Sequence, residues 1–331
     1  MKKKNLTTIC MFVLFISVLS SALGGCSSVP ESEALEMTGI YFDTVVQIRA
    51  WGTTQSVLDE CQNICEKYEN MFSTEIADSE IAQINTANGE PVEVSGETAE
   101  LIRTALDYCE LSGGKFDITI APLSRLWNFG SEQSGVIPDA DAISEACSHI
   151  DYHLVELDGN TVTLADPQAQ IDLGGIAKGY IADRLKEYLT SEGVEHALIN
   201  LGGNTVAVGE RYDGDPFRIG IQKPFAESGE TIDTIEIVDR SVVSSGNYQR
   251  YFEQDGTIYH HILDPETGYP YQNDLYQVTI ISDHSVDGDA LSTTCFALGL
   301  EEGSRLIENL ENVSAIFITS DYELHYVGFD E

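Results

Sequence analysis

Apolar residues recur with a helical period in several parts of the chain. Between residues 56 and 72 they stand three or four positions apart, which is the spacing of one face of an amphipathic helix. Asp59 and Glu60, near the start of this segment, suit the first turn of a helix. The same kind of pattern predicts further helices at residues 79–85, 97–112, 139–148, 177–189 and 285–298.

Other segments are rich in β-branched and aromatic residues, which favour an extended chain. They predict strands at residues 44–51, 170–173, 197–201, 217–222, 231–238, 257–262, 276–282 and 315–320. Residues 154–164 predict a hairpin that turns at Asp158-Gly159-Asn160. Because helices and strands are mixed and the strands are mostly hairpin-like, we expect an α+β fold.

The first residues differ from this globular pattern. A basic start is followed by an apolar run, Leu6 to Leu19, which is shorter than the roughly 20 residues needed to cross a bilayer. The run ends in Leu23-Gly24-Gly25-Cys26, which resembles the lipobox of bacterial lipoproteins. We expect a signal peptide over residues 1–25, a lipid on Cys26, a tether over residues 26–36 and a globular domain over residues 37–331. The alternative is a plain signal peptide with an incidental cysteine.

The charge of the chain limits its partners. The formal net charge of the 331 residues is -38, so nucleic acid and anionic lipid would both be repelled. Solubility outside the cell is a simple and sufficient reason for such a charge. It also means that an anionic substrate would need a divalent cation or local basic groups in order to bind.

Five cysteines follow the predicted signal and anchor: Cys61, Cys65, Cys109, Cys147 and Cys295. An odd number does not imply a complete disulfide framework. Cys61 and Cys65 are one helical turn apart, with no histidine or second cysteine pair near them in the sequence. Packing within a helix is therefore favoured over zinc binding for this pair. The redox state of the five is left open.

Three segments carry candidate chemistry, and the first runs from Asp172 to Tyr180. Its glycine pair, Gly174-Gly175, stands between a predicted strand and a predicted helix. Such a turn frees backbone N–H groups at a helix N-terminus, where a phosphate is stabilised. Lys178 adds a positive charge to the first helical turn. The spacing is not that of a Walker loop, and the segment alone equally fits a tight turn.

The second segment runs from His260 to Pro270. Asp264-Pro265-Glu266-Thr267-Gly268 predicts a rigid turn, which would hold His261 in a fixed position at the end of a strand. Histidine is the usual proton acceptor near neutral pH. Because neighbouring residues on a strand point to opposite faces, at most one of His260 and His261 should act directly.

The third segment, Asp287 to Thr294, begins a predicted helix. Asp289 and Thr293 are one turn apart on one face of that helix. Their oxygens could share a hard cation, and oxygen is the ligand type that Mg²⁺ prefers. The alternative is capping of the helix N-terminus by aspartates, which this segment alone favours.

Together these segments resemble the ApbE family of FAD:protein FMN transferases. Eight blocks match in order over nearly all of the chain after the signal. The blocks are Phe72-Ser73-Thr74 with Ser79-Glu80-Ile81 and Asn85; Gly113 to Thr119 with Pro122-Leu123 and Leu126-Trp127; Asp172 to Tyr180; Asn200 to Asn204; Ile219 to Pro224; Ser244 to Tyr248; the His261 turn; and the Asp289 to Thr293 helix. The resemblance implies a T-fold-like α+β domain of mixed, largely antiparallel sheets flanked by helices.

The resemblance also implies roles for individual residues. Mg²⁺ would be held by Asp289, Thr293 and the backbone carbonyl of Gly175, and His261 would handle the proton of an acceptor hydroxyl. One departure is visible, because Phe42-Asp43-Thr44 stands where the family often has Met-Gly-Thr. Phe42 could still pack on a flavin ring. The other residues implied to line the flavin nucleotide are Lys115, Phe116, Asp117, Asp172, Lys178 and Ile262, with Glu75 a weaker candidate.

The implied reaction is Mg²⁺-dependent transfer of FMN from FAD to a threonine or serine hydroxyl of another protein, with AMP leaving. The implied partners are FAD, a flavin-carrying domain of an exported or membrane redox complex, and the membrane through the lipid anchor. Two alternatives stay open: Mg²⁺-dependent hydrolysis of FAD to FMN and AMP, and a flavin-binding lipoprotein without turnover. The joint presence of Lys178, His261, Asp289 and Thr293 argues against the second, since a pure binder needs no metal-bridged diphosphate.

Overall fold

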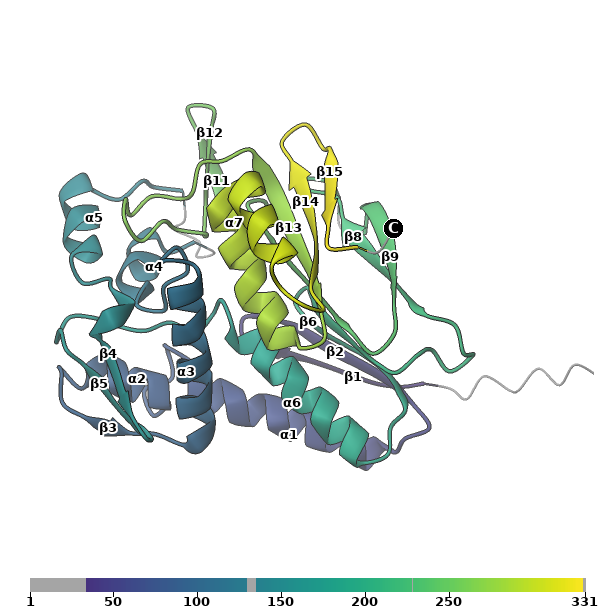
Figure 1. Ribbon diagram of the computed structural model, residues 1–331. Coiled ribbons are helices and arrows are strands. Elements are labelled where there is room, and N and C mark those ends of the chain that lie inside the picture. Colours follow the sequence, from purple (N-terminus) through teal and green to yellow (C-terminus); the bar gives the residue numbers. More distant parts are fainter. Residues whose placement is uncertain (1–33, 130–134, 228, 330–331) are drawn as a thin grey trace, which may run out of the picture. The chain divides into compact units, whose positions relative to one another are not determined.

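An antiparallel sheet of eight strands forms the centre of the fold in the computed structural model, which describes residues 34–129, 135–227 and 229–329 (Figure 1). The order across the sheet is β1-β2-β6-β7-β10-β13-β14-β15, and each neighbouring pair is antiparallel. The strands are β1 (Leu35–Tyr41), β2 (Thr44–Trp51), β6 (His196–Leu201), β7 (Asn204–Val208), β10 (Ser241–Gly246), β13 (Leu275–Ser282), β14 (Ser314–Thr319) and β15 (Leu324–Val327). The expected α+β fold with largely antiparallel strands is confirmed.

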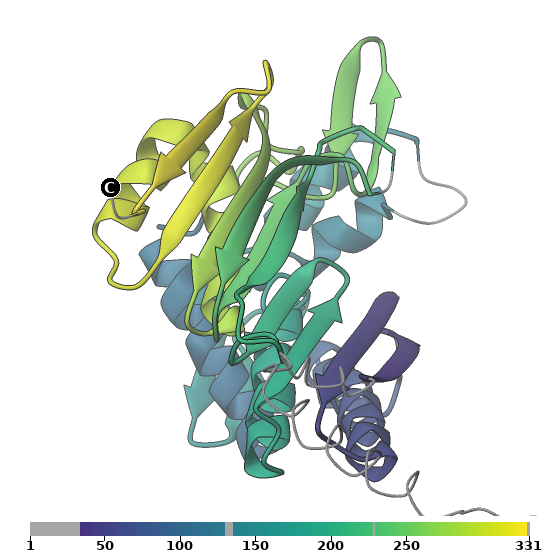
Figure 2. The ribbon, with the colours of Figure 1, turned by 90° about the vertical axis from the view of Figure 1, so that its right-hand side faces the viewer.

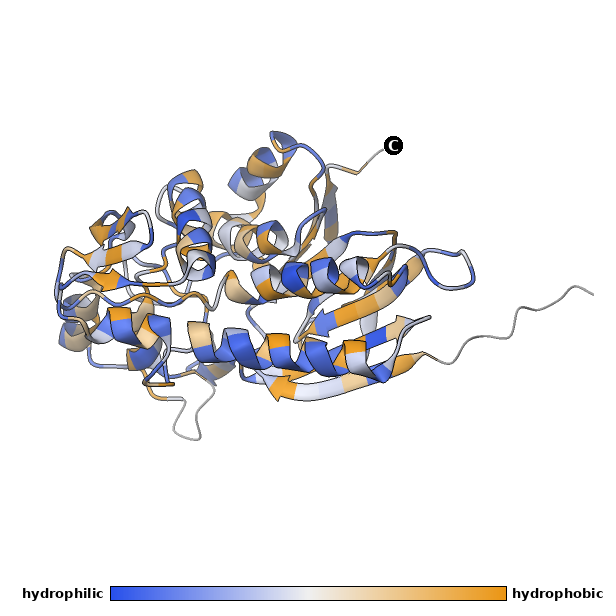
Figure 3. Cartoon of the chain, turned by 90° about the horizontal axis from the view of Figure 1, so that it is seen from below, coloured by the Kyte–Doolittle hydropathy of each residue, from blue (hydrophilic) through white to orange (hydrophobic). Residues whose placement is uncertain are grey.

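Helices cover one face of this sheet, as Figures 1 and 2 show for α1, α6 and α7. The helices are α1 (Gln55–Phe72), α2 (Glu80–Thr86), α3 (Gly96–Leu111), α4 (Ala121–Trp127), α5 (Ala140–Cys147), α6 (Ala177–Ser191) and α7 (Ser285–Glu308), with a short 3₁₀ turn at Tyr152–Leu154. Seen from below, the helices carry hydrophilic and hydrophobic positions in alternation (Figure 3), the pattern of elements that are buried on one side only.

Three small sheets complete the fold. They are β3 (Val92–Glu93) with β5 (Thr161–Leu164) and β4 (Val155–Asp158); β8 (Phe217–Gln222) with β9 (Thr231–Ile237); and β11 (Tyr251–Gln254) with β12 (Thr257–His260). Phe217 and Ile235 of the second small sheet share an apolar cluster with Val242 and Ile281 of the central sheet. The central sheet therefore buries apolar residues on both of its faces.

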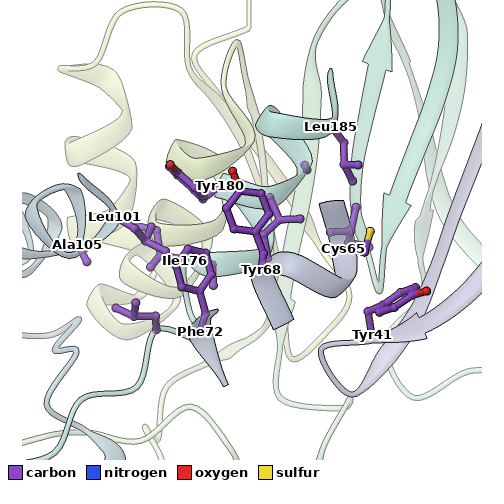
Figure 4. Close-up of a cluster of buried hydrophobic side chains, with 14 of the residues drawn as sticks. Tyr41, Cys65, Tyr68, Phe72, Leu101, Ala105, Ile176, Tyr180 and Leu185 are labelled. Atoms are coloured by element: carbon purple, nitrogen blue, oxygen red, sulfur yellow. The ribbon is translucent and has the colours of Figure 1, made fainter. Parts of the chain in front are cut away.

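The largest apolar cluster lies between the central sheet and the helices. Tyr68 and Phe72 of α1 meet Tyr180 of α6 edge to face, with 5.8 and 6.0 Å between ring centroids (Figure 4). Such aromatic pairs contribute stability beyond the area they bury. Cys61 and Cys65 are fully buried in the same cluster, which confirms that they pack within α1. Burial raises the pKa of both thiols to about 12.

Most of the expected elements are present within one or two residues of their predicted ends, but one predicted strand is absent, and the helix expected at 285–298 continues past a non-helical Gly299 to Glu308. Residues 170–173 are not a strand, since only Gln170 makes a single bridge, to Ile120. The next residue is held instead by a side chain, because the Asn85 amide bonds both Ile171 N, at 2.7 Å, and Ile171 O, at 2.8 Å. The strand expected at 257–262 ends at His260, so His261 lies just beyond it.

The expectations for the N-terminus fall almost entirely outside the described residues. The signal peptide, Cys26 and its lipid stay predictions. The tether was expected to reach residue 36, whereas β1 already begins at Leu35. From there to residue 329 the described chain belongs to one compact unit. None of its helices is long and apolar enough to span a bilayer.

Candidate functional site

A cavity of about 320 Å³ collects most of the residues singled out from the sequence. It is bounded by the loop after α3, the glycine turn before α6 and the first turns of α7. The chain after β10 and the turn after β12 complete its wall. Its lining includes Lys115, Phe116, Asp117, Asp172, Gly175, Lys178, His261, Ile262, Asp289 and Thr293. Residues up to about 180 positions apart in the chain thus meet at one place.

Helices α6 and α7 cross with their first turns in contact, and this crossing positions Asp289. A side chain at Gly179 would place its Cβ 2.3 Å from the Ser285 carbonyl oxygen, so the crossing requires glycine. Asp289 is 3% exposed, and its carboxylate accepts a hydrogen bond from Gly179 N at 2.9 Å. Lys178 Nζ lies 3.4 Å from the other carboxylate oxygen. The Asp289 side chain is thus buried and fixed at the N-terminus of α6.

The crossing is fastened from the other side by Asp183 of α6. Its carboxylate accepts hydrogen bonds from Ser285 N at 2.8 Å and Val286 N at 2.9 Å, the first backbone donors of α7. Burial raises the pKa of Asp183. The alternative that aspartates of the 287–294 segment cap this helix is therefore wrong, because the N-cap residue is His284, without a side-chain cap, and the carboxylate that accepts from the first N–H groups comes from α6. Asp289 itself is left to face the cavity.

Hydroxyl oxygens lie next to Asp289. Thr293 lies one turn further along α7. Ser245 Oγ of β10 is 3.2 Å from Thr293 Oγ1 and 2.8 Å from Ser292 Oγ. The described residues contain no group of three or more histidine, cysteine, aspartate or glutamate side chains that could hold a metal. A metal in this cavity would therefore take one carboxylate, with hydroxyl, carbonyl and substrate oxygens as its other ligands. That set of hard oxygens suits Mg²⁺.

The glycine turn is shaped by its own side-chain contacts. Asp172 Oδ1 accepts a hydrogen bond from Gly174 N at 2.8 Å, and Lys178 Nζ donates to Gly174 O at 3.1 Å. A Cβ at Gly175 would lie 2.8 Å from the ring of Phe116, so the turn approaches that ring closely. The backbone of Gly174 and Gly175 therefore lines the cavity next to Lys178.

Asp117 lines the cavity wall and also holds the surrounding loops together. One carboxylate oxygen accepts from Thr119 N at 2.8 Å and Thr119 Oγ1 at 2.6 Å, and the other from Tyr152 N at 3.0 Å. Burial raises the pKa of this carboxyl. Lys115 lies in a looser setting, with its Nζ 3.9 Å from Glu266 and 5.9 Å from the Tyr271 ring centroid.

The two neighbouring histidines lie in different environments. His260 is buried, with Nε2 2.8 Å from Tyr271 O and Nδ1 accepting from Ile262 N at 3.3 Å. His261 lines the cavity, and its buried Nδ1 has no hydrogen-bonding partner in the described part of the chain. Burial is the main cause that lowers the pKa of His260 to about 4 and that of His261 to about 3. Only His261 is available for chemistry.

The expected rigid turn is confirmed, and it anchors the wall of the cavity. Asp264 accepts from Glu266 N at 3.1 Å and Thr267 Oγ1 at 3.1 Å through its carboxylate, and from Gly268 N at 2.8 Å through its carbonyl. Trp127 Nε1 donates to Gly268 O at 2.7 Å. Gly268 has a φ of +73°, a conformation that favours glycine.

The comparisons with known proteins agree with this site. The model of the ApbE family matches residues 42–317. The chain belongs to the ApbE family. An FAD:protein FMN transferase of Klebsiella pneumoniae (strain 342) is 37% identical over 297 residues, covering 89% of this chain and 92% of that protein. One of Treponema pallidum (strain Nichols) is 34% identical over 321 residues, covering 90% and 88%.

Solved structures of ApbE proteins share the fold. The ApbE protein from Thermotoga maritima has a TM-score of 0.82 at 30% identity, covering 89% of this chain and 97% of that one. The flavin transferase ApbE from Vibrio cholerae has a TM-score of 0.81 at 28% identity, with 89% and 97% covered. Nearly the whole of the described chain thus corresponds to the ApbE fold.

Two residues implied by the ApbE resemblance do not line the cavity. Phe42 lies in the turn between β1 and β2 with a φ of +54°, beside the ring of Tyr41, and its N–H donates to Glu69 at 2.9 Å. Glu75 is exposed in the loop after α1. Their contact with a flavin stays a prediction.

Other lining residues of this ApbE-family cavity were not proposed from the sequence. They include Phe129, Asn204, Ser244, Ser245, Gln249 and Arg250. Ser244 and Ser245 lie within a block that carried the resemblance, so that block was the available signal for them. Arg250 lies on a bend between β10 and β11, where no local pattern distinguishes it from any exposed arginine.

Proposed function

We propose that this protein transfers FMN from FAD to a threonine or serine hydroxyl of an acceptor protein and releases AMP. The supporting observation is the cavity, in which a buried aspartate, a glycine turn with its lysine, and an available histidine from three separate segments lie together. The relatives named FAD:protein FMN transferase support the same reaction. The protein would then be a transferase that modifies other proteins, with FAD as its second substrate.

The cavity is suited to hold the diphosphate of FAD. Lys178 and the backbone of the glycine turn face the space beside Asp289, and phosphate is stabilised at such a helix N-terminus. Mg²⁺, held by Asp289, Thr293 and the Gly175 carbonyl, would neutralise diphosphate charge when bound. A single carboxylate fits this role, because Mg²⁺ usually binds one or two carboxylates together with substrate phosphates.

The bonds exchanged are few. The acceptor hydroxyl oxygen forms a bond to the phosphorus of the FMN phosphate, and the bond from that phosphorus to the bridging oxygen breaks. AMP leaves with the electron pair of the broken bond. Positioning supplies most of the catalysis in such a transfer, so the chain's main task is to align the hydroxyl with the phosphorus.

His261 is the residue that we assign to the hydroxyl proton. Its imidazole is neutral at pH 7, because its pKa lies far below that value, and a neutral imidazole can accept a proton. Nδ1 is buried, so we assign proton transfer to Nε2. His260 is excluded from this role because both of its nitrogens are bonded to the backbone.

The site of action belongs to the same proposal. A signal over residues 1–25 and a lipid on Cys26 would hold the enzyme on the outer face of a bacterial cell membrane. The acceptor would then be a flavin-carrying domain of an exported or membrane redox complex. Metabolic labelling with a fatty acid, compared between the natural chain and Cys26→Ala, tests the anchor.

A gel assay tests the function. The protein without its signal is incubated with FAD, Mg²⁺ and a candidate acceptor domain, and flavin fluorescence is read after denaturing electrophoresis. We expect a fluorescent acceptor band that EDTA or Asp289→Ala abolishes. Asp59→Ala, at an exposed aspartate of α1 outside the cavity lining, is the matched control and should leave the band unchanged. A band of equal strength with Asp289→Ala would contradict the role of that carboxylate.

A further inference from the structure

Arg250 is exceptional among the cations of this acidic protein. The described part of the chain contains fourteen of the seventeen lysines and arginines, since only Lys2, Lys3 and Lys4 fall outside it. Within that part, every cation except Arg250 has a side-chain ion pair or hydrogen bond. Arg103 and Arg125 also lack a carboxylate partner but bond other oxygens, so the exposed Arg250 is the one described lysine or arginine whose side chain meets no protein oxygen.

The position of Arg250 supplies an explanation. Its side chain lines the cavity together with Lys115 and Lys178, and its backbone carbonyl accepts a hydrogen bond from His261 N at 3.2 Å. Arg250 is therefore adjacent to the residue assigned to the acceptor hydroxyl. Lys178 is engaged by Asp289, and Lys115 lies near Glu266. Among the described cations of the cavity, only Arg250 has its charge uncompensated.

The segment before Arg250 is fixed to the central sheet. Asn247 is bonded to β13 twice, through its own N–H to Tyr276 O at 3.1 Å and through Nδ2 to Leu275 O at 3.1 Å. Tyr248 OH donates to Gln277 of the same strand at 2.6 Å. Arg250 then leads into the β11–β12 hairpin, which projects from the body of the fold (Figure 2). Its backbone is held in place on both sides.

We propose that the Arg250 guanidinium binds the FMN-side phosphate of FAD and stabilises the charge of that phosphate during transfer. This inference rests on the proposed FMN transfer. A guanidinium donates two parallel hydrogen bonds to phosphate oxygens. The diphosphate carries two phosphates, and the Lys178 end of the cavity serves one of them. The phosphate that is attacked must lie beside His261, which is where Arg250 stands.

The competing explanation is that Arg250 binds a carboxylate of the acceptor protein. The observed contacts favour the phosphate, because Arg250 lines the same cavity as Lys178 and shares a backbone hydrogen bond with His261. An acceptor contact would need only the outer surface of the hairpin. The two explanations differ in which substrate loses affinity when the charge is removed.

Ligand binding without any acceptor tests the proposal. FMN and riboflavin differ only by the phosphate, and their affinities are measured by flavin fluorescence for the natural protein, Arg250→Gln and Arg250→Lys. We expect Arg250→Gln to weaken FMN binding by about tenfold or more, the usual loss for a charged hydrogen-bonding pair, and riboflavin binding to stay the same. Arg250→Lys should restore part of the FMN affinity. Arg218→Gln, an exposed arginine on β8, is the matched control and should change neither.

The outcomes are separable. Equal FMN affinity in Arg250→Gln and Arg218→Gln overturns the proposal, and so does an effect confined to the KM for the acceptor. If riboflavin binds too weakly to measure, the comparison of FMN affinity between these two variants decides. In the transfer assay we expect Arg250→Gln to lower kcat by on the order of 10²-fold, as for other lost charge stabilisers. If the natural protein transfers no flavin, the proposed function fails, while the FMN measurement still tests whether Arg250 binds phosphate.

Discussion

At the scale of single residues, the adjacent His260 and His261 have different roles: His260 is structural and His261 is available for chemistry. Both side chains lose water, and the pKa of both is lowered. The nitrogens of His260 are both bonded to backbone groups, whereas His261 lines the cavity with an Nδ1 that has no partner among the residues the structure describes. The sequence predicted that at most one of them acts, and only the structure identifies His261 as that one.

Replacing His261 by alanine should separate binding from transfer. We expect FAD affinity to remain within about twofold and transfer to slow by roughly 10²- to 10⁴-fold, the usual contribution of a placed proton acceptor. FAD titration and single-turnover flavin transfer measure the two quantities. His153→Ala, an exposed histidine outside the cavity lining, serves as the control. Unchanged transfer with His261→Ala would remove its proposed role.

The lowered pKa of His260 predicts how the free energy of unfolding depends on pH. Its folded pKa is about 4, whereas an unfolded histidine has a pKa of about 6.5. Between these values the unfolded chain binds more protons, so this contribution to stability is lost as pH falls from 6.5 towards 4. Between pH 7 and pH 5 the loss should be about 2 kcal/mol.

Urea unfolding at both pH values, compared between the natural protein and His260→Gln, isolates this effect. The buried carboxyls Asp117 and Asp183, whose pKa is raised, act in the opposite direction but are present in both proteins. The decrease in the free energy of unfolding on acidification should be smaller in His260→Gln by that amount. An identical decrease would show that His260 does not stay neutral in the folded state.

Ten residues of the cavity lining could be predicted from the sequence, because they lie in blocks that match the ApbE family in the same order. Arg250 could not, because its significance lies in having no side-chain partner among the described residues, which only the folded chain reveals. The same holds for Asp183, which carries no motif and whose role depends on the approach of two helices. Phe42 is the opposite case: the ApbE resemblance implied that it contacts the flavin, but its side chain is not part of the cavity lining.

At the scale of elements, the crossing of α6 and α7 builds the centre of the site. Gly179 permits the close approach, Asp183 caps α7, and Asp289 returns a hydrogen bond to α6. The helices themselves follow from apolar periodicity. Their crossing does not, because it depends on contacts between residues about 100 positions apart.

Replacing Asp183 by alanine should loosen this crossing. Two backbone N–H groups at the start of α7 would lose their acceptor in a buried place, and the free energy of unfolding should fall by about 1–3 kcal/mol. Urea unfolding measures the loss. Asp283→Ala, an exposed aspartate just before α7, is the control and should have little effect. Equal stability of the two variants would contradict the capping role.

The strand expected at residues 170–173 failed for a physical reason. Alternating apolar residues there fit a strand, but Ile171 is bonded on both its N–H and C=O by Asn85. A side chain therefore satisfies the backbone groups that a neighbouring strand would otherwise bond. Local pattern cannot reveal such a partner 86 positions away. Most helix ends, by contrast, were predictable from periodicity and turn residues.

At the scale of the whole molecule, the few basic side chains are unevenly distributed. A chain of net charge -38 brings Lys115, Lys178 and Arg250 to one cavity. The overall field repels anions, so an anionic substrate depends on these side chains and on a bound cation. The α+β class was predictable from the mixture of elements, whereas the strand order, and hence the cavity, was not.

The most direct test of the central claim compares AMP released with flavin covalently bound to the acceptor. Both are quantified in one reaction of FAD, Mg²⁺, enzyme and acceptor domain, by chromatography and by the intact mass of the acceptor. Transfer in this cavity predicts one bound FMN for each AMP, with no free FMN formed. AMP accompanied by an equal amount of free FMN, and an acceptor of unchanged mass, would contradict it.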